Sequence, residues 1–191
     1  MMNDLIQKIR DRLPHLEDVA SHTFGNQPRF AAVMISMYFV GDELYLPFIV
    51  RPAYDGVHSG QVAFAGGKAE ETDRDRVHTA MREAEEEIGI TVLDEHIIGV
   101  MPQLYVVPSN MLVTPVIACL PERPHFVIDP NEVAKVLEVP VAALLNPANH
   151  STRQVVFPNN VKMKFPSYLV QGEEIWGATG RMISELFKLI N

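Results

Sequence analysis

The sequence predicts an α/β (α+β) domain in which helices pack on mixed or mostly antiparallel strands. Three observations support this class: apolar residues at helical spacing near both ends of the chain, a central segment with helical periodicity, and apolar runs of strand length between them. No internal repeat or low-complexity linker divides the 191 residues. We therefore expect one domain over residues 1–191.

The first predicted element is a helix over residues 3–13. Its four apolar residues recur at helical spacing, and Pro14 ends the pattern. We expect residues 1–28 to form a helical N-terminal extension of the domain.

The central part of the chain predicts a hairpin followed by a loop and a helix. Gly41-Asp42 is a turn signal between two apolar runs, and the helix is acidic on part of its surface. The expected order is a buried strand at 31–40, its hairpin partner at 43–50, a loop at 51–60 containing Pro and Gly, a short strand at 61–64, a loop at 66–74 and a helix at about 75–88.

The C-terminal part predicts further strands and two helices. Residues 146–160 contain Pro147, Pro158 and four Asn, so we expect a surface connection there. Residues 102–108 fit no single element. The expected elements are strands at 97–101, 113–120, 133–139, 162–170 and 174–176, a short helix at 141–145, and a last helix capped by Thr179.

The net charge of −8 comes mainly from one stretch of the chain. Ten of the 24 Asp and Glu residues fall between Lys68 and Glu95, with only four Lys or Arg. This balance argues against a nonspecific nucleic-acid binder, because phosphate contacts need clustered cations. The stretch lies in the middle of the chain and has helical periodicity, which also argues against a disordered acidic tail.

The number of cysteines and the hydropathy of the sequence predict the cellular compartment of the protein. The single cysteine, Cys119, excludes an internal disulfide framework. The longest apolar run, Ala31–Val40, is too short to span a bilayer, and the N-terminus lacks a secretory-signal pattern. We therefore expect a cytoplasmic protein without membrane or nucleic-acid partners.

A helical wheel of residues 77–88 separates two faces. Val77, Ala80, Met81, Ala84 and Ile88 fall on a core arc, whereas Glu83, Glu86 and Glu87 share a neighbouring arc and Glu85 points elsewhere. Like charges at this spacing repel each other, so the stripe suits a hard divalent cation that prefers oxygen ligands. The alternative is a solvated glutamate-rich face.

The residues around this helix resemble a known motif. Residues 67–90 are similar to the Nudix box, Gly-x5-Glu-x7-Arg-Glu-U-x-Glu-Glu-x-Gly-U, where U is bulky and apolar. The closing half reads Arg82-Glu83-Ala84-Glu85-Glu86-Glu87-Ile88-Gly89-Ile90. The opening half departs from the motif in two ways. Asp73 stands in place of Glu, and eight residues, not seven, separate this position from Arg82. The resemblance implies one Nudix hydrolase domain, an α/β/α sandwich with a mixed sheet and a loop-helix-loop catalytic motif.

The departures resemble the coenzyme A pyrophosphatase branch of this family. That branch has Asp at this position, the longer spacing, and an upstream signature that agrees here at Arg51, Gly60, Val62, Phe64, Gly66 and Gly67. Three signature positions differ, namely Pro52, Gly56 and Ala65. Trp176-Gly177-x-Thr179 before the last helix also resembles the branch.

The resemblance implies metal-dependent hydrolysis of a nucleoside diphosphate-linked small molecule. The motif assigns Glu83, Glu86 and Glu87 as ligands of Mg²⁺ or Mn²⁺, with Arg82 orienting a glutamate. A general base comes from the box or from a later loop, where Glu132 is the candidate. The expected substrate is coenzyme A or acyl-coenzyme A, giving 3′,5′-ADP and (acyl-)4′-phosphopantetheine.

Substrate-binding residues are expected just before the box. Arg51 and Lys68 would meet phosphates, and Gly66 and Gly67 would shape the loop, although both cations can equally be surface charges. His58 can be a solvated histidine or touch phosphate. Cys119, Tyr168 and Trp176 are expected in the core. The apolar termini also suggest a possible homodimer.

Two other functions remain open from the sequence. One is a Nudix diphosphohydrolase for ADP-ribose or a nucleoside triphosphate, which the three altered signature positions favour. The other is a Nudix-fold binding module without turnover, which the retention of Glu83, Glu86 and Glu87 in the closing half disfavours.

Overall fold

A long central strand, β1 (Arg29–Val40), organises the fold. The computed structural model describes residues 2–13, 27–53, 60–156 and 160–190. Strand β1 runs antiparallel to β2 (Glu43–Val50) across the predicted Gly41-Asp42 turn and antiparallel to β4 (Ala65–Lys68). On its other edge it runs parallel to β7 (Met111–Cys119) over nine residue pairs.

The remaining strands extend this mixed sheet. They are β3 (Val62–Ala63) and β8 (Lys135–Pro140), which both pair with β2, and β5 (Ile97–Val100) and β6 (Leu104–Val106), which both pair with β7. All of these pairings are antiparallel. The parallel β1–β7 contact makes the sheet mixed, as the sequence predicts.

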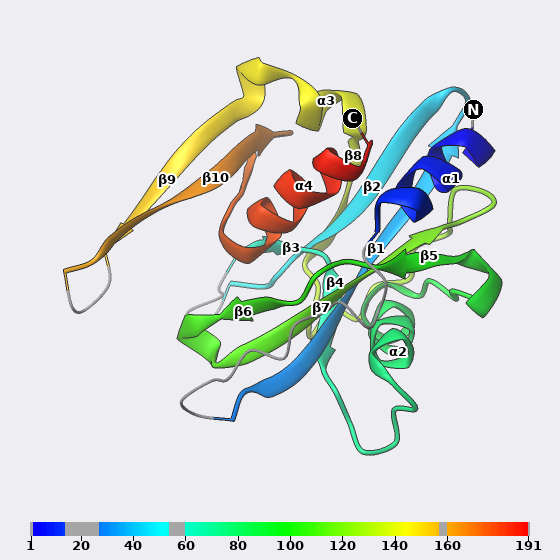
Figure 1. Cartoon of the computed structure of the whole chain (residues 1–191), viewed down its shortest axis with the longest axis horizontal. Helices are drawn as coiled ribbons and strands as arrows, with labels where there is room; N and C mark the ends of the chain where they lie inside the picture. Colours follow the sequence, from blue (N-terminus) through cyan, green and yellow to red (C-terminus); the bar gives the residue numbers. More distant parts are fainter. Residues whose placement is uncertain (1, 14–26, 54–59, 157–159, 191) are drawn as a thin grey trace.

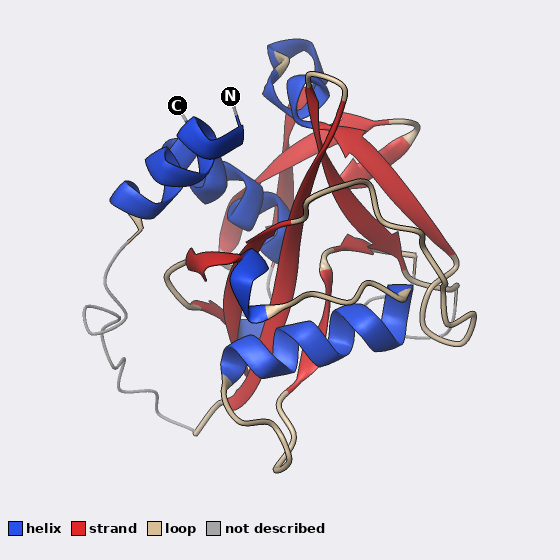
Figure 2. Ribbon diagram, turned by 90° about the vertical axis from the view of Figure 1, so that its right-hand side faces the viewer, coloured by secondary structure: helices blue, strands red, loops and turns tan. Residues whose placement is uncertain are grey.

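Alternation along β1 divides the core into two layers. Ile35 and Met37 belong to one buried cluster, and Met34 and Tyr38 to the other. Helices α1 (Met2–Arg12) and α4 (Gly177–Ile190) cover the first face of the sheet, and α2 (Arg76–Ile88) covers the second, as Figures 1 and 2 show. Helices on both faces give the expected α/β/α arrangement.

A second sheet extends from the body of the molecule. It contains β9 (His150–Val156), β10 (Lys162–Val170) and β11 (Glu173–Ile175), in the order β11-β10-β9. The short helix α3 (Val141–Leu145) precedes it, and the β9–β10 hairpin projects at the left of Figure 1. Among the described residues, no helix has the length and apolar character needed to cross a bilayer.

The first and last helices pack on each other through their apolar faces. Ile9 is fully buried in the same cluster as Ile183 and Leu186, and Leu5 and Ile190 lie against it. The helix predicted at 3–13 and the apolar stripe of the last helix are thus confirmed. The apolar residues of the two termini suggested a homodimer, but they pack against each other within one chain.

Three local predictions are wrong. The expected loop at 66–74 begins as strand β4, because glycines at 66 and 67 allow the backbone to pack closely on β1. The expected surface connection at 146–160 contains β9, whose exposed residues show no strand-like alternation of polarity. Thr179 does not cap α4, because the helix begins at Gly177 and Thr179 is buried in its first turn.

Phe64 tests the packing of the first core layer. It is 1% exposed and stacks on Phe48 with ring centroids 4.7 Å apart. Phe64→Ala should lower the free energy of unfolding by about 3–5 kcal/mol, because it leaves a cavity in a close-packed core. Urea denaturation of Phe30→Ala provides the control: Phe30 is 45% exposed and contacts Arg76, so that change should cost about 1 kcal/mol or less. Equal losses in the two variants would contradict this packing.

Candidate active site

Both ends of helix α2 are fixed by local signals. The carboxylate of Asp75 accepts the backbone N–H of His78 at 2.8 Å, which caps the N-terminus. Gly89 ends the helix with a left-handed φ of 70°, and its N–H is donated to the carbonyls of Ala84 and Glu85. The helix therefore presents its glutamates in a defined register.

The core face of α2 places two glutamates against strand β4. Ala80, Ala84 and Ile88 are buried against β1 and β4, as the helical wheel predicts. Because the glutamate arc adjoins this core arc, Glu83 and Glu87 are buried as well. The stripe is therefore a partly buried surface and not a solvated glutamate-rich face.

Glu87 is the most deeply buried carboxylate of the stripe, with 2% exposure. Its Oε2 accepts the backbone N–H of Gly66 at 2.7 Å. Its Oε1 has no hydrogen-bond partner among the described residues, and Arg51 Nη2 lies 3.8 Å from it. Burial raises the pKa of Glu87 to about 7, although the Gly66 N–H and the Arg51 charge act in the opposite direction.

Glu83 lies directly against Gly67. A Cβ at position 67 would be 2.4 Å from Glu83 Oε1, so no side chain fits there without displacing the carboxylate. Burial also raises the pKa of Glu83, against the effect of Arg82. The Gly66-Gly67 pair thus supplies a close-packed cradle for both buried glutamates and lies in strand β4, not in the loop expected from the sequence.

Arg82 connects two of the box glutamates, Glu83 and Glu86, to the preceding loop. Its Nη1 donates to Glu83 Oε1 at 3.0 Å and to Glu86 Oε2 at 2.8 Å. Its Nη2 donates to the carbonyl oxygen of Lys68 at 2.9 Å. Unlike the other two glutamates, Glu86 has a side chain that is 59% exposed, so the stripe has a buried floor and an open rim.

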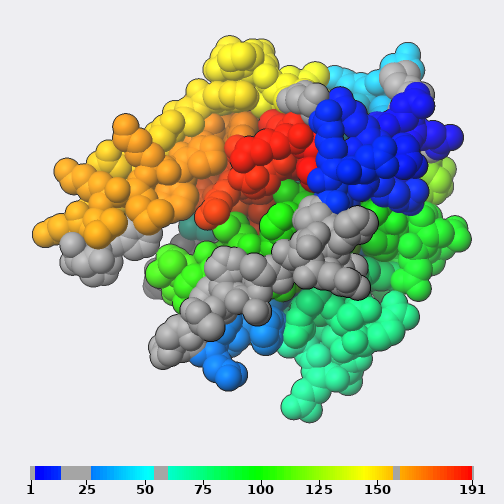
Figure 3. Space-filling model, viewed as in Figure 1, coloured from blue at the N-terminus to red at the C-terminus, as the bar shows by residue number. Residues whose placement is uncertain are grey.

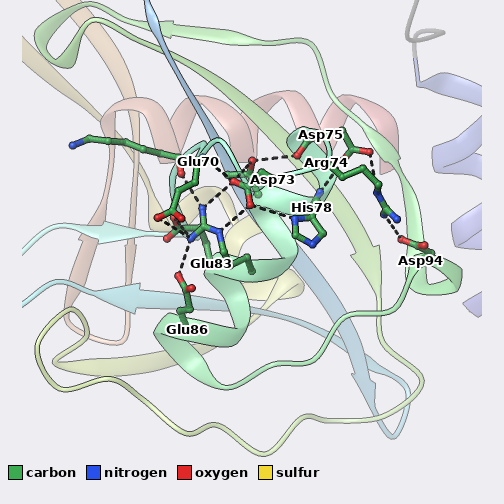
Figure 4. A network of polar contacts seen from close by, with 11 residues as sticks. Glu70, Asp73, Arg74, Asp75, His78, Glu83, Glu86 and Asp94 are labelled. Atoms are coloured by element: carbon green, nitrogen blue, oxygen red, sulfur yellow. Dashed lines mark hydrogen bonds and ion pairs between the residues drawn. The ribbon is translucent and has the colours of Figure 1, made fainter.

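Asp73 is a site residue to which the sequence reasoning gave no role. Its side chain is fully buried and accepts Arg82 Nε and Nη2, both at 3.0 Å (Figure 4). The Thr79 hydroxyl and the Glu70 backbone N–H also donate to it, and these bonds hold its pKa well below the usual range. The sequence did contain a signal for this role, because Asp73 occupies the Glu position in the opening half of the box.

The loop between β7 and β8 brings Glu132 toward the stripe. Backbone N–H groups of Val127 and Asp129 donate to the carbonyls of Ile88 and Glu87, which ties this loop to the C-terminal end of α2. The charge of Glu132 contributes to the raised pKa of both Glu83 and Glu87, so Glu132 lies near them. Glu132 itself is exposed at the rim.

The expected substrate-binding residues surround the same glutamates. Arg51, Gly66 and Gly67 contact Glu87 or Glu83, and Lys68 is exposed at the end of β4. Cys119 and Tyr168 are buried away from this site, as expected. Trp176 is only partly buried, unlike the core position expected for it, and packs under Arg153 with 4.1 Å between the guanidinium carbon and the ring centroid. The loop position His58 falls outside the described residues.

The donor set fits a hard divalent cation, although it is not assembled as a closed metal cage. Within the described ranges, no three His, Cys, Asp or Glu side chains already converge on one point. The fit rests on the buried Glu87 Oε1, which has no hydrogen-bond partner among the described residues, and on the Glu83 and Glu86 carboxylates, which one arginine holds at short range. Oxygen donors of this kind match the preferences of Mg²⁺ and Mn²⁺.

Comparison with known proteins identifies the family. The model of the NUDIX domain matches residues 28–159, so the chain belongs to the Nudix family. Its members act on small nucleotide-type substrates and generally use divalent metal ions. Together with its Nudix hydrolase relatives, this makes the chain a pyrophosphohydrolase.

Two relatives and two solved structures illustrate the likeness. Human mitochondrial coenzyme A diphosphatase NUDT8 is 33% identical over 80% of this chain, which spans 66% of the human protein. The Nudix hydrolase NudL of Pectobacterium atrosepticum is 33% identical over 97% of this chain and 92% of its own. A MutT/nudix family protein from Enterococcus faecalis shares the fold with a TM-score of 0.58, at 15% identity over 96% of this chain and 71% of its own. The NUDIX domain of Shewanella oneidensis NrtR, solved with ADP ribose, has a TM-score of 0.53, at 16% identity over 70% of this chain and 87% of its own.

The raised pKa of Glu87 predicts a pH-dependent stability of the metal-free protein. Folding raises this pKa from 4.5 to about 7, so the stability linked to the protonated group is complete below pH 4.5 and is lost as the pH rises through about 7. The loss should be about 3 kcal/mol, because one pKa unit corresponds to about 1.4 kcal/mol.

Glu87→Gln should remove most of this pH dependence, because the amide cannot ionise. Urea denaturation in chelator at about pH 5 and about pH 8 measures the effect. Glu85→Gln, on an exposed position of the same helix, should retain the wild-type pH dependence. Parallel pH profiles for wild type and Glu87→Gln would contradict the buried position of Glu87.

Proposed function

We propose that the chain hydrolyses coenzyme A or acyl-coenzyme A to 3′,5′-ADP and (acyl-)4′-phosphopantetheine. The observation that carries this proposal is the position of Arg51, 3.8 Å from Glu87 across from the Gly66-Gly67 cradle. Arg51 and both glycines belong to the signature that resembles the coenzyme A pyrophosphatase branch. The similarity to human NUDT8, a coenzyme A diphosphatase by name, supports the same substrate class.

Glu83, Glu86 and Glu87 would hold Mg²⁺ or Mn²⁺. When bound, the cation neutralises diphosphate oxygens and makes a bound water more acidic. The buried floor formed by Glu83 and Glu87 fixes two carboxylates, while the exposed Glu86 closes the site from the rim. Low solvent access strengthens the electrostatic interactions of these groups with a cation.

Arg82 and Asp73 act as positioning residues. Asp73 holds two nitrogens of the Arg82 guanidinium, which leaves Nη1 directed at Glu83 and Glu86. This arrangement offsets the repulsion among the carboxylates and fixes their orientation before substrate arrives.

The proton of the attacking water requires a base near the glutamate floor. Glu132 faces Glu83 and Glu87 from the β7–β8 loop and is our candidate, with a box glutamate as the alternative. The water oxygen bonds to one phosphorus and its proton passes to the base, while the bond from that phosphorus to the bridging oxygen breaks. The bridging oxygen leaves with the other phosphate group, so 3′,5′-ADP and (acyl-)4′-phosphopantetheine each keep one phosphate of the former diphosphate. Arg51 and Lys68 would pair with the anionic substrate.

A second candidate substrate class is ADP-ribose or a nucleoside triphosphate. Pro52, Gly56 and Ala65 replace three residues of the upstream signature, which favours a substrate other than coenzyme A. A binding module without turnover is disfavoured because the three glutamates proposed as metal ligands, Glu83, Glu86 and Glu87, are all retained. For either substrate class we propose a cytoplasmic enzyme, in keeping with its single buried cysteine.

A substrate panel separates these functions. The protein is incubated with coenzyme A, an acyl-coenzyme A, ADP-ribose and a nucleoside triphosphate, each with Mg²⁺ or Mn²⁺, and the products are identified by mass. We expect 3′,5′-ADP from the first two. Rapid cleavage of ADP-ribose without cleavage of coenzyme A would overturn the proposed substrate, and no turnover of any diphosphate would favour a binding module.

Glu86→Gln tests the ligand assignment. Removing this charge should lower turnover on the order of 100-fold or more, while the fold remains intact because Glu86 is largely exposed. Steady-state kinetics with circular dichroism measures both effects. The matched control is Glu85→Gln, which lies on the same helix away from the stripe and should keep wild-type activity. Near-normal rates for Glu86→Gln at saturating Mg²⁺ would count against its role as a ligand.

A further inference from the structure

The outer part of the β9–β10 hairpin projects away from the body of the molecule, whereas Tyr168 and Val170 at its base belong to the first core layer. It projects from the body between α3 and α4, and Figure 3 shows it as the yellow and orange arm at the left. Nearly all side chains of β9 are exposed, including those of Ser151, Thr152 and Gln154. A two-stranded ribbon without a buried face is only marginally stable in water, so a further contact would stabilise the part of this arm that lies beyond β11.

Strand β9 has a free hydrogen-bonding edge. Among the described strands it pairs with β10 alone and forms the end of the second sheet. Antiparallel partners alternate between residue pairs that exchange two backbone hydrogen bonds and pairs that exchange none. Thr152 lies opposite Pro166, which has no N–H, so this pair exchanges none. By alternation, the N–H and C=O groups of Thr152 and Gln154 point away from β10.

None of the usual protections of an edge strand is found in β9. Its seven residues contain no proline, and the register with β10 continues without a shift. Its only formal charge, Arg153, is neutralised by Glu174 at 2.5 Å and packs on Trp176. The edge is therefore open to another strand.

Charge and apolar exposure indicate which strand fits this edge. Residues 146–172 contain three Lys or Arg and no Asp or Glu, whereas the whole chain carries a net charge of −8. Two copies of this acidic protein repel each other over most of their surface but not at this arm. Val156 and Met163 at the outer part of the arm are 54% and 46% exposed, which adds apolar area to such a contact.

We propose that β9 pairs antiparallel with β9 of a second copy, joining the two three-stranded sheets across a two-fold axis. An antiparallel edge is self-complementary, because each copy offers the same alternating donors and acceptors. This surface replaces the apolar termini as the reason for a homodimer, since α1 and α4 cover each other within one copy. The proposal is independent of the catalytic assignment.

Gln154→Pro tests the pairing by removing an outward N–H from each copy. The β9–β10 ladder keeps all of its bonds, because that N–H points away from β10. Sedimentation equilibrium of the full chain should show a dimer for wild type, and the variant should raise the dimer dissociation constant at least about tenfold. The matched control, Gln154→Ala, retains the N–H and should associate as wild type does.

Hydrogen exchange of the wild-type protein provides a measurement that does not depend on the variant. The amides of Thr152 and Gln154 should exchange more slowly as protein concentration rises, because dimerisation protects them. A wild-type protein that is monomeric at the highest attainable concentration would overturn the proposal, with the edge then available to an extended peptide of another protein. A dimer that persists unchanged in Gln154→Pro, without concentration-dependent protection at these amides, would place the interface elsewhere.

Discussion

The site depends on the close approach of helix α2 to strand β4. Gly66 donates its N–H to Glu87, and Gly67 leaves the space that the Glu83 carboxylate fills. Two carboxylates are thereby buried side by side, which is unfavourable unless cations compensate them. This cost raises the pKa of Glu87 to about 7 in the metal-free protein, and the proposed divalent cation would offset it. Burial of these two carboxylates lowers the stability of the metal-free fold and places them where the proposed chemistry needs them.

The arginine network makes this burial tolerable before any cation binds. Asp73 is fully buried and holds the Arg82 guanidinium through two nitrogens, so the third is left for Glu83 and Glu86. Charge-assisted bonds of this fork geometry are stronger than neutral ones and fix orientation. The shorter side chain of Asp73, compared with Glu in the general motif, accompanies one additional residue before Arg82. The insertion and the substitution can therefore be understood as one compensated change.

Much of the architecture and the identity of the stripe could be predicted from sequence, because both follow from periodicity. The core face of α2 and the hairpin of β1 with β2 follow from simple helical and strand patterns. Strand β4 could not be predicted, because its Gly66-Gly67 pair has low strand propensity and is held by contacts with β1. Strand β9 was missed because its exposed residues lack alternation and its ladder with β10 defines it. The fixed position of Asp73 depends on its side-chain bonds to Arg82, which hydrophobic periodicity does not show.

The most direct test of this account is a crystal structure of the protein with Mn²⁺, examined by anomalous scattering. The account predicts a peak within coordination distance of carboxylate oxygens from Glu83, Glu86 and Glu87, with Glu87 Oε1 among the ligands and Arg82 Nη1 displaced from Glu83. A structure at saturating Mn²⁺ in which Arg82 still bridges Glu83 and Glu86, with the manganese peak elsewhere or absent, would contradict it.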